Sequence, residues 1–367
     1  MQRAQRSIGF AFVFVLGISF APTAQAAYHF GNFHGRPPIH ILAGTSKMPQ
    51  GVTPAEIKNV YHLPAGGGHG TIVIVGAYDD ATIEADLAAF NKQFGLRTCT
   101  SANGCFAKHK MSAKMNSDSN WNMEMTLDVE WAHAIAPDAN IVLVEAATPS
   151  GANLVKAVDY AASIKDASAI SMSWGGTEFP EELSYDSHFA SVSGAPFFAS
   201  SGDNGTGASW PAASPKVVAV GGTSLAFSAK GLFKKETAWT GSGGGVSAYE
   251  KEPSFQTDYS IPKAGGMRAI PDVAYNADPS SGFSIVCGGT WYVVGGTSAG
   301  APQWAAIATL GNGAANTNFY ADKSSAANAS YFRDITSGTN GSCGYLCTAR
   351  KHYDYVTGLG SPLTVRF

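Results

Sequence analysis

This chain of 367 residues has little charge of either sign. Charged residues make up 14% of it, against the roughly 25% that is usual for soluble domains. The formal net charge is only -3, so no large field of one sign attracts nucleic acid or an anionic membrane surface. After the N-terminus, no apolar run is long enough to cross a bilayer. The length allows a sizeable core, in one large domain or in two smaller ones.

The N-terminus has the pattern of a secretory signal peptide. Arg3 and Arg6 supply positive charge, residues 8–20 are apolar, and Ala24-Gln25-Ala26 fits a small-x-small cleavage site. An uncleaved membrane anchor would need a longer apolar run. We therefore predict a signal peptide over residues 1–26 and export to the periplasm or the cell exterior. No membrane attachment is expected once this peptide is removed.

Cysteine is scarce, with five residues in the chain. Cys99 and Cys105 bracket one short loop, and Cys343 and Cys347 bracket another, so each pair can form a local disulfide in an oxidising compartment. Cys287 is left over and is interpreted as a buried apolar side chain. A zinc site is not expected, because no histidine cluster accompanies either pair.

Residues 27–52 are interpreted as a short irregular leader, rich in Gly, His and Pro. From residue 53 onward, apolar strand-like runs such as 71–76 and 141–144 alternate with helical patterns such as 81–94. This alternation predicts an α/β fold with a doubly wound, mostly parallel sheet flanked by helices. We expect a single domain over residues 53–367.

A candidate nucleophile, Ser298, lies in the segment 295–304, between a strand-like run and a helical stretch. Pro302 suits the first turn of a helix, so Ser298 would lie at a helix N-terminus, where the dipole favours developing negative charge. The alternative is a serine that only caps the helix. The two readings are separated by whether a general base accompanies the hydroxyl.

No histidine provides that base convincingly. His69 lies on a Gly-rich loop directly before a strand, and the other eight histidines have no recognisable catalytic setting. Glu124 and Asp128, on the helix-like segment 122–135, stand at i and i+4 and share one face, which continues on apolar residues. On a buried stripe the two carboxyls would share a proton, which raises their apparent pKa. A solvated acidic face is the alternative, and it suits Glu130.

Three segments resemble those of one peptidase family. Gly-Thr-Ser298-x-x-x-Pro302 resembles the nucleophile motif shared by subtilisins and sedolisins, and the segment 201–205 resembles their oxyanion element, with Asp203 where subtilisins carry Asn. Glu124-x-x-x-Asp128 resembles the sedolisin base motif, on the helix where subtilisins carry histidine. From residue 53 to its C-terminus the chain is therefore identified as similar to the sedolisin (serine-carboxyl peptidase) family. The resemblance implies a subtilisin-like fold.

The resemblance also implies a mechanism. Ser298 would attack the peptide carbonyl, Glu124 would accept its proton and pass it to the leaving amine, and Asp128 would hydrogen-bond Glu124. Asp203 would donate a hydrogen bond to the oxyanion, for which its carboxyl must be protonated. Activity is therefore expected below about pH 5, since an ordinary Asp titrates near 3.9 and burial raises that value.

The expected substrates are polypeptides. Ser173-Trp174-Gly175 resembles the family strand that pairs with the extended substrate backbone, a contact that says little about side-chain preference. The chain is accordingly expected to be a secreted, acid-active endopeptidase, and a monomer.

A C-terminal calcium site is implied by the same resemblance. The ligands would be the carboxylates of Asp334 and Asp354 and the backbone carbonyls of Ile335, Arg350 and His352, and hard oxygen ligands suit Ca²⁺. The family usually carries Gly at the last two carbonyl positions, where the backbone bends. The alternative is a loop with ordinary surface acids. One structural calcium ion is the expectation.

Two other functions remain open. A subtilisin-type peptidase would need a catalytic histidine near Glu124, and His133 stands on the same segment but more than two turns further on. A catalytically silent secreted binding protein could also keep this fold, because a fold alone does not give a function. The activation route is open as well, since family members usually carry a long propeptide where this chain has residues 27–52.

Overall fold

The structure, a computed structural model, describes Phe30, residues 33–321 and residues 329–367. The predicted signal peptide, residues 1–26, and the first residues of the leader lie outside the described residues. Among the described residues, no helix combines the length and the apolar character needed to cross a membrane.

A central sheet of eight strands organises the molecule, in the order β10-β9-β7-β5-β2-β4-β3, with β13 also paired to β9. All of these pairs are parallel except β10 with β9. The strands are β2 (Thr71–Ala77), β3 (Phe106–Lys110), β4 (Asn140–Ala146), β5 (Ala167–Met172), β7 (Phe197–Ser200), β9 (Val217–Phe227), β10 (Phe233–Ala238) and β13 (Val273–Asn276). Every residue of β2 is buried, as expected for a strand covered on both faces. The prediction of a mostly parallel α/β sheet is confirmed.

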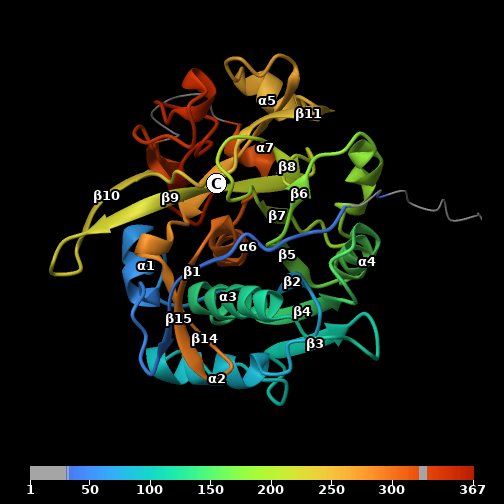
Figure 1. Ribbon diagram of the computed structural model, residues 1–367, viewed down its shortest axis with the longest axis vertical. Helices are drawn as coiled ribbons and strands as arrows, with labels where there is room; N and C mark the ends of the chain where they lie inside the picture. Colours follow the sequence, from blue (N-terminus) through green and yellow to red (C-terminus); the bar gives the residue numbers. More distant parts are fainter. Residues whose placement is uncertain (1–29, 31–32, 322–328) are drawn as a thin grey trace, which may run out of the picture.

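Helices cover both sides of this sheet (Figure 1). The long helix α3 and its neighbour α6 lie on one side, and α4 lies on the other. The helices are α1 (Pro54–Val60), α2 (Ile83–Phe94), α3 (Ser119–Ile135), α4 (Gly151–Ala162), α5 (Ser254–Tyr259), α6 (Gly300–Leu310) and α7 (Asn316–Phe319). The side chain of Asp118 caps α3 by accepting the N–H groups of Asn120 and Trp121. From Met123 to its end at Ile135, α3 is buried on all sides, because α2, α6 and the sheet surround it.

Smaller elements complete the fold. Short sheets are formed by β1 (His40–Ser46), β14 (Phe283–Cys287) and β15 (Thr290–Gly295), by β6 (Gly176–Thr177) and β8 (Ser209–Trp210), by β11 (Gly245–Lys251) and β12 (Met267–Ile270), and by β16 (Phe332–Arg333) and β17 (Ser361–Pro362). The 3₁₀ turns are η1 (Glu182–His188), η2 (Pro279–Ser281), η3 (Thr297–Ala299) and η4 (Gly344–Cys347).

The leader is not wholly irregular, which corrects the sequence-based expectation for residues 27–52. Its strand β1 pairs antiparallel with β15, with His40 opposite Gly295 and Ile41 opposite Val294. The unpaired backbone groups along β15 offer the leader a partner that lies far away in the sequence. Local composition, dominated by Gly, His and Pro, gave no sign of this pairing.

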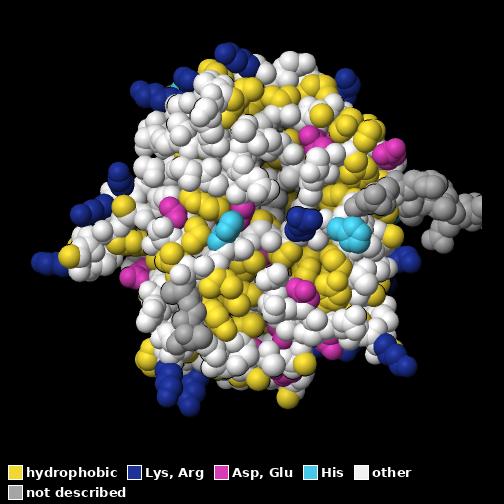
Figure 2. All heavy atoms as spheres, in the orientation of Figure 1, with side chains coloured by type: hydrophobic (Ala, Val, Ile, Leu, Met, Phe, Trp, Pro, Cys, Tyr) yellow, Lys and Arg dark blue, Asp and Glu magenta, His cyan; other side chains and the backbone are white. Residues whose placement is uncertain are grey.

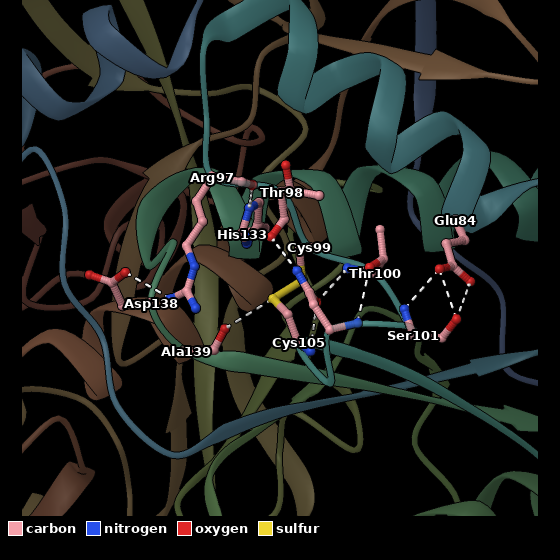
Figure 3. The surroundings of a disulfide bond; sticks show 11 residues. Glu84, Arg97, Thr98, Cys99, Thr100, Ser101, Cys105, His133, Asp138 and Ala139 are labelled. Carbon is pink, nitrogen blue, oxygen red and sulfur yellow. Dashed lines mark hydrogen bonds and ion pairs between the residues drawn. A yellow bond between two sulfur atoms is a disulfide. The ribbon is translucent and has the colours of Figure 1, made fainter.

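Both cysteine pairs form disulfides, Cys99 with Cys105 and Cys343 with Cys347. Cys287 has no disulfide partner and is half-buried rather than fully buried. One expectation about the first pair was wrong, because His133 of α3 does lie next to it (Figure 3). The folded chain brings this histidine to the disulfide from a distant part of the sequence. In the structure both sulfur atoms are already used in the covalent bond.

Candidate active site

Glu124 and Asp128 lie on the buried face of α3 that contacts α6 and η3. Each is 1% exposed. Burial raises the pKa of Glu124 well above its usual range, and the adjacent Asp128 carboxyl raises it further. Burial also raises the pKa of Asp128, against the opposing hydrogen bond from Ser173. Two buried carboxyls this close bind protons as a pair, so one of them stays protonated over a wide pH range.

The Ser173 side chain supports this acid pair. Its Oγ donates to Asp128 Oδ1 at 2.7 Å and lies 3.2 Å from the carbonyl oxygen of Ser298. The neighbouring Trp174 is fully buried, and its Nε1 donates to the carbonyl of Val75 at 3.1 Å. Both side chains therefore serve the interior. Of the three residues predicted to bind substrate, Gly175 pairs through its backbone with another extended segment, at Arg36.

Ser298 lies in η3, the turn that leads into α6, so it has the expected position at the start of a helix. The turn depends on Gly296, whose φ is +133°. A Cβ atom there would lie 1.9 Å from the carbonyl oxygen of Pro38 and 2.6 Å from Asp203 Oδ2, so only glycine fits. The Ser298 Oγ donates to that same Pro38 oxygen at 2.9 Å.

Asp203, on the loop that follows β7, reaches the same point from the opposite direction. Its Oδ1 accepts both the backbone N–H and the hydroxyl of Thr297 at 2.8 Å. Its Oδ2 lies 3.0 Å from Nε2 of His40, as an ion pair without hydrogen-bond alignment. Burial raises the pKa of Asp203, and the contacts with His40 and Thr297 oppose that shift. In turn Asp203 raises the pKa of His40.

The four residues that the sequence nominated for catalysis therefore meet at one place. Asp128, Ser298 and Asp203 all lie close enough to Glu124 to affect its pKa. Neither carboxylate oxygen of Glu124 has a hydrogen-bond partner, because the Ser298 hydroxyl points to Pro38 instead. Next to them is a cavity of about 920 Å³, lined by β6, by the loop after β7 and by the leader. The arrangement combines a hydroxyl, a buried acid pair and a third buried acid.

Two interpretations of α3 need correction or comment. Glu130, which was expected to be solvated, is 0% exposed, and its Oε2 accepts the N–H of Val286 at 3.1 Å. The reason is that α3 has no solvent face at this point. His133 lies about 14 Å further along the helix axis than Glu124. Its Nε2 contacts the carbonyl oxygen of Arg97 at 2.8 Å, beside the disulfide (Figure 3). The structure thus gives it no place at Ser298.

His40 is the residue near the site that the sequence did not single out. It stands in the leader, outside every motif, and its partner Asp203 is more than 160 positions away in the chain. No local pattern marks it. His69, by contrast, lies on an exposed loop before β2, as expected.

The residues predicted to hold calcium form a compact C-terminal cluster. Asp354 accepts the N–H groups of Arg350 at 2.9 Å and Val356 at 2.8 Å, and Asp334 accepts the N–H of His352 at 3.0 Å. One short segment thus lies between both carboxylates. His352 has φ +65°, the bend that glycine usually supplies.

These residues fit a hard cation. Burial raises the pKa of Asp354 to about 7 and also raises the pKa of Asp334. Two carboxylates removed from water in this way are stabilised by a bound cation. Ile335, whose carbonyl is a further predicted ligand, follows Asp334 directly and is 2% exposed.

Comparison with known proteins agrees with this geometry. Kumamolisin of Bacillus sp. (strain MN-32) is 30% identical over 399 aligned positions, which cover 96% of this chain and 69% of the relative. Sedolisin of Pseudomonas sp. (strain 101) is 28% identical over 88% of this chain and 61% of the relative. A solved structure of Pseudomonas sedolisin, a serine-carboxyl proteinase complexed with two molecules of pseudo-iodotyrostatin, matches with a TM-score of 0.73 at 28% identity, covering 86% of this chain and 96% of that one. No protein-family model matches the chain.

The fold and these relatives define a serine peptidase with a subtilisin-like α/β domain. The chain belongs to the sedolisin family of serine-carboxyl peptidases.

Proposed function

We propose that this chain is a secreted, acid-active endopeptidase that uses a Ser298–Glu124–Asp128 triad and Asp203 as oxyanion donor. The Ser298 hydroxyl attacks the peptide carbonyl, and Glu124 takes its proton and returns it to the leaving amine. Asp128, held by the Ser173 hydroxyl, shares a proton with Glu124. The substrates are polypeptides, and the protein acts as a monomer after its signal peptide has been removed.

The meeting of the four side chains at the junction of α3, η3 and the loop after β7 carries this proposal. In the present arrangement the Ser298 hydroxyl donates to Pro38, and Glu124 has two buried oxygens without partners. An unpaired buried carboxyl is costly, so Glu124 is available to accept the Ser298 proton when the Pro38 carbonyl leaves. Catalytic hydrogen bonds often tighten only when substrate is bound.

Acid operation follows from Asp203. A carboxyl can donate a hydrogen bond to an oxyanion only while it is protonated, and the ionised form would repel the oxyanion. Burial raises the pKa of Asp203, which widens the acid range over which it can donate. We therefore propose that activity peaks below about pH 5 and declines as Asp203 ionises.

A single calcium ion has a structural role in this proposal. The carboxylates of Asp334 and Asp354, with the carbonyls of Ile335, Arg350 and His352, would hold it. The ion would neutralise two buried carboxylates and fasten the C-terminal loop. It takes no part in proton transfer at Ser298.

The test is the digestion of casein or haemoglobin from pH 2 to pH 8 by the wild type and by Ser298→Ala and Glu124→Gln. Both variants are expected to lose at least about 1,000-fold in kcat/KM at the acid optimum. Glu130→Gln, which changes another buried acid on the same helix, is the matched control and should retain most of the activity. Near-neutral activity that survives Glu124→Gln would favour a histidine base. Absence of Ser298-dependent cleavage at every pH would favour a silent binding protein.

A further inference from the structure

The leader occupies the groove in which a peptide substrate is expected to bind. In Figure 1 its blue segment crosses the front of the molecule past α6 before it enters β1. The Arg36 N–H donates to the Gly175 carbonyl at 3.0 Å, and the Gly175 N–H donates back to the Arg36 carbonyl at 3.2 Å. This is an antiparallel two-way pairing, the way in which an extended peptide adds to an exposed strand.

The leader is also in register with the nucleophile. Two residues after Arg36, the carbonyl of Pro38 accepts the Ser298 hydroxyl at 2.9 Å. The same oxygen is the atom that would meet a Cβ at Gly296, so it lies against the turn that carries Ser298. A single peptide carbonyl is thus presented to the hydroxyl, while the residues before it are held by strand pairing.

His40 anchors the far side of this segment. Its Nε2 lies 3.0 Å from Asp203 Oδ2, and its ring packs edge-on against Trp239, with centroids 5.8 Å apart. The groups that face Asp203 are the Thr297 N–H and hydroxyl, His40 and, more distantly, Glu124. Within the described residues His40 is the one cationic group in contact with this acid. Figure 2 shows histidine and basic side chains in a row across this face, with hydrophobic surface on both sides.

We propose that residues 33–40 are an intramolecular ligand of the substrate groove, and that His40 fastens this segment by its ion pair with Asp203. The proposal rests on the proposed function only in taking this groove as the substrate groove. While the segment is bound, it blocks peptide entry, diverts the Ser298 hydroxyl and keeps Asp203 ionised, so the oxyanion donor is disabled.

The ion pair makes this block sensitive to pH. Near neutral pH a protonated His40 and an ionised Asp203 attract each other, and the pairing raises the pKa of His40. As the pH falls, Asp203 takes up a proton and the attraction is lost, while His40 remains charged. The leader therefore loosens at the pH at which Asp203 becomes a hydrogen-bond donor.

Amide hydrogen exchange tests this inference without any need for activity. The full chain carrying Ser298→Ala is compared with the same chain carrying in addition His40→Gln, Arg36→Pro or His34→Gln. His40→Gln removes the ion pair, and Arg36→Pro removes the N–H that Gly175 accepts. At pH 7 we expect each of these two variants to speed exchange at residues 33–40 at least tenfold. His34→Gln, a leader histidine without contact to Asp203, is the control and should leave exchange unchanged.

An inhibition assay supplies a second measurement. A synthetic peptide of residues 33–40 should inhibit the wild-type enzyme competitively, more strongly at pH 6 than at pH 3.5, and the peptide with His40→Gln should inhibit at least tenfold more weakly. Unchanged leader exchange in both His40→Gln and Arg36→Pro would overturn the inference, even if peptide hydrolysis is confirmed. Faster exchange in these variants would support it even if no hydrolysis is found, so the two failures are distinguishable.

Discussion

At the scale of single residues, Asp203 shows how one carboxyl can be held for two purposes. Its Oδ1 is fixed by the N–H and the hydroxyl of Thr297, so this oxygen acts only as an acceptor. Its Oδ2 faces His40 and the Pro38 carbonyl region, and this is the oxygen that must carry a proton to donate. The two oxygens of one side chain therefore have different tasks. An amide would separate these tasks permanently, because one atom only accepts and the other only donates.

This gives a prediction for Asp203→Asn and Asp203→Ala. Asparagine can keep both Thr297 contacts through its oxygen and donate through its nitrogen at any pH. We therefore expect Asp203→Asn to retain measurable activity and to lose the decline of kcat/KM that Asp203 ionisation causes above pH 5. Asp203→Ala should lose about 100- to 1,000-fold at the optimum, as expected when one oxyanion donor is removed. Identical pH profiles for the wild type and Asp203→Asn would contradict the donor role.

At the scale of elements, the turn η1 carries a second group of buried acids outside the catalytic centre. Glu182 is 0% exposed, and its Oε2 accepts the N–H of Phe179 at 2.9 Å. Burial, with the neighbouring Glu178 carboxyl, raises the pKa of Glu182 to about 9. Glu250 of β11 is also buried, and burial raises its pKa to about 8. The two elements are thus packed together through carboxyls that prefer to be neutral.

The sign of the resulting pH effect on stability is determined by these raised pKa values. In the unfolded chain both groups ionise near about pH 4.5, whereas in the folded chain they stay protonated to about pH 8 or 9. Their contribution is therefore fully present below pH 4.5 and is lost as the pH rises toward 9. This packing suits an acidic environment.

We accordingly expect the melting temperature to fall between pH 5 and pH 8, by about 2 °C or more from these groups. Glu182→Gln, which keeps the shape without the titrating proton, should reduce that slope. Glu181→Gln, one residue earlier and exposed, is the control and should leave the slope unchanged. Calorimetry across this pH range gives the result, and equal slopes for Glu182→Gln and the wild type would show that this acid is not responsible.

At the scale of the whole molecule, the C-terminal loop is fastened through Asp334 and Asp354. These carboxylates are held by backbone N–H groups from the segment around Arg350 and His352. A cation bound by both acids would join residues that lie well apart in the chain. It would also bind the folded state far better than the unfolded one.

Removal of calcium should therefore lower the melting temperature of the whole domain. A cation present at about 100 times its dissociation constant stabilises the folded state by about 2.7 kcal/mol. We expect EGTA to remove this stabilisation and added CaCl₂ to restore it. Asp354→Asn should melt at the same temperature with and without the chelator. A wild-type melting curve that does not respond to EGTA would count against the site.

The sequence by itself determined the features that depend on local patterns. Alternating apolar runs and helical periods predicted the parallel sheet, and the spacing of Glu124 and Asp128 put them on one face of α3 whatever the tertiary contacts. The glycines and proline around Ser298 likewise predicted a turn leading into a helix. Each of these is specified by residues within a few positions of one another, so it can be read along the chain.

Only the tertiary structure decided the features that require partners far apart in the chain. It buried Glu130, placed His133 beside the Cys99–Cys105 disulfide, and paired the leader with β15 and Gly175. It also brought His40 to Asp203, a contact between two polar residues that no periodicity marks. The physical reason is that such pairings are selected by the shape and burial of the assembled surfaces, which local spacing does not encode.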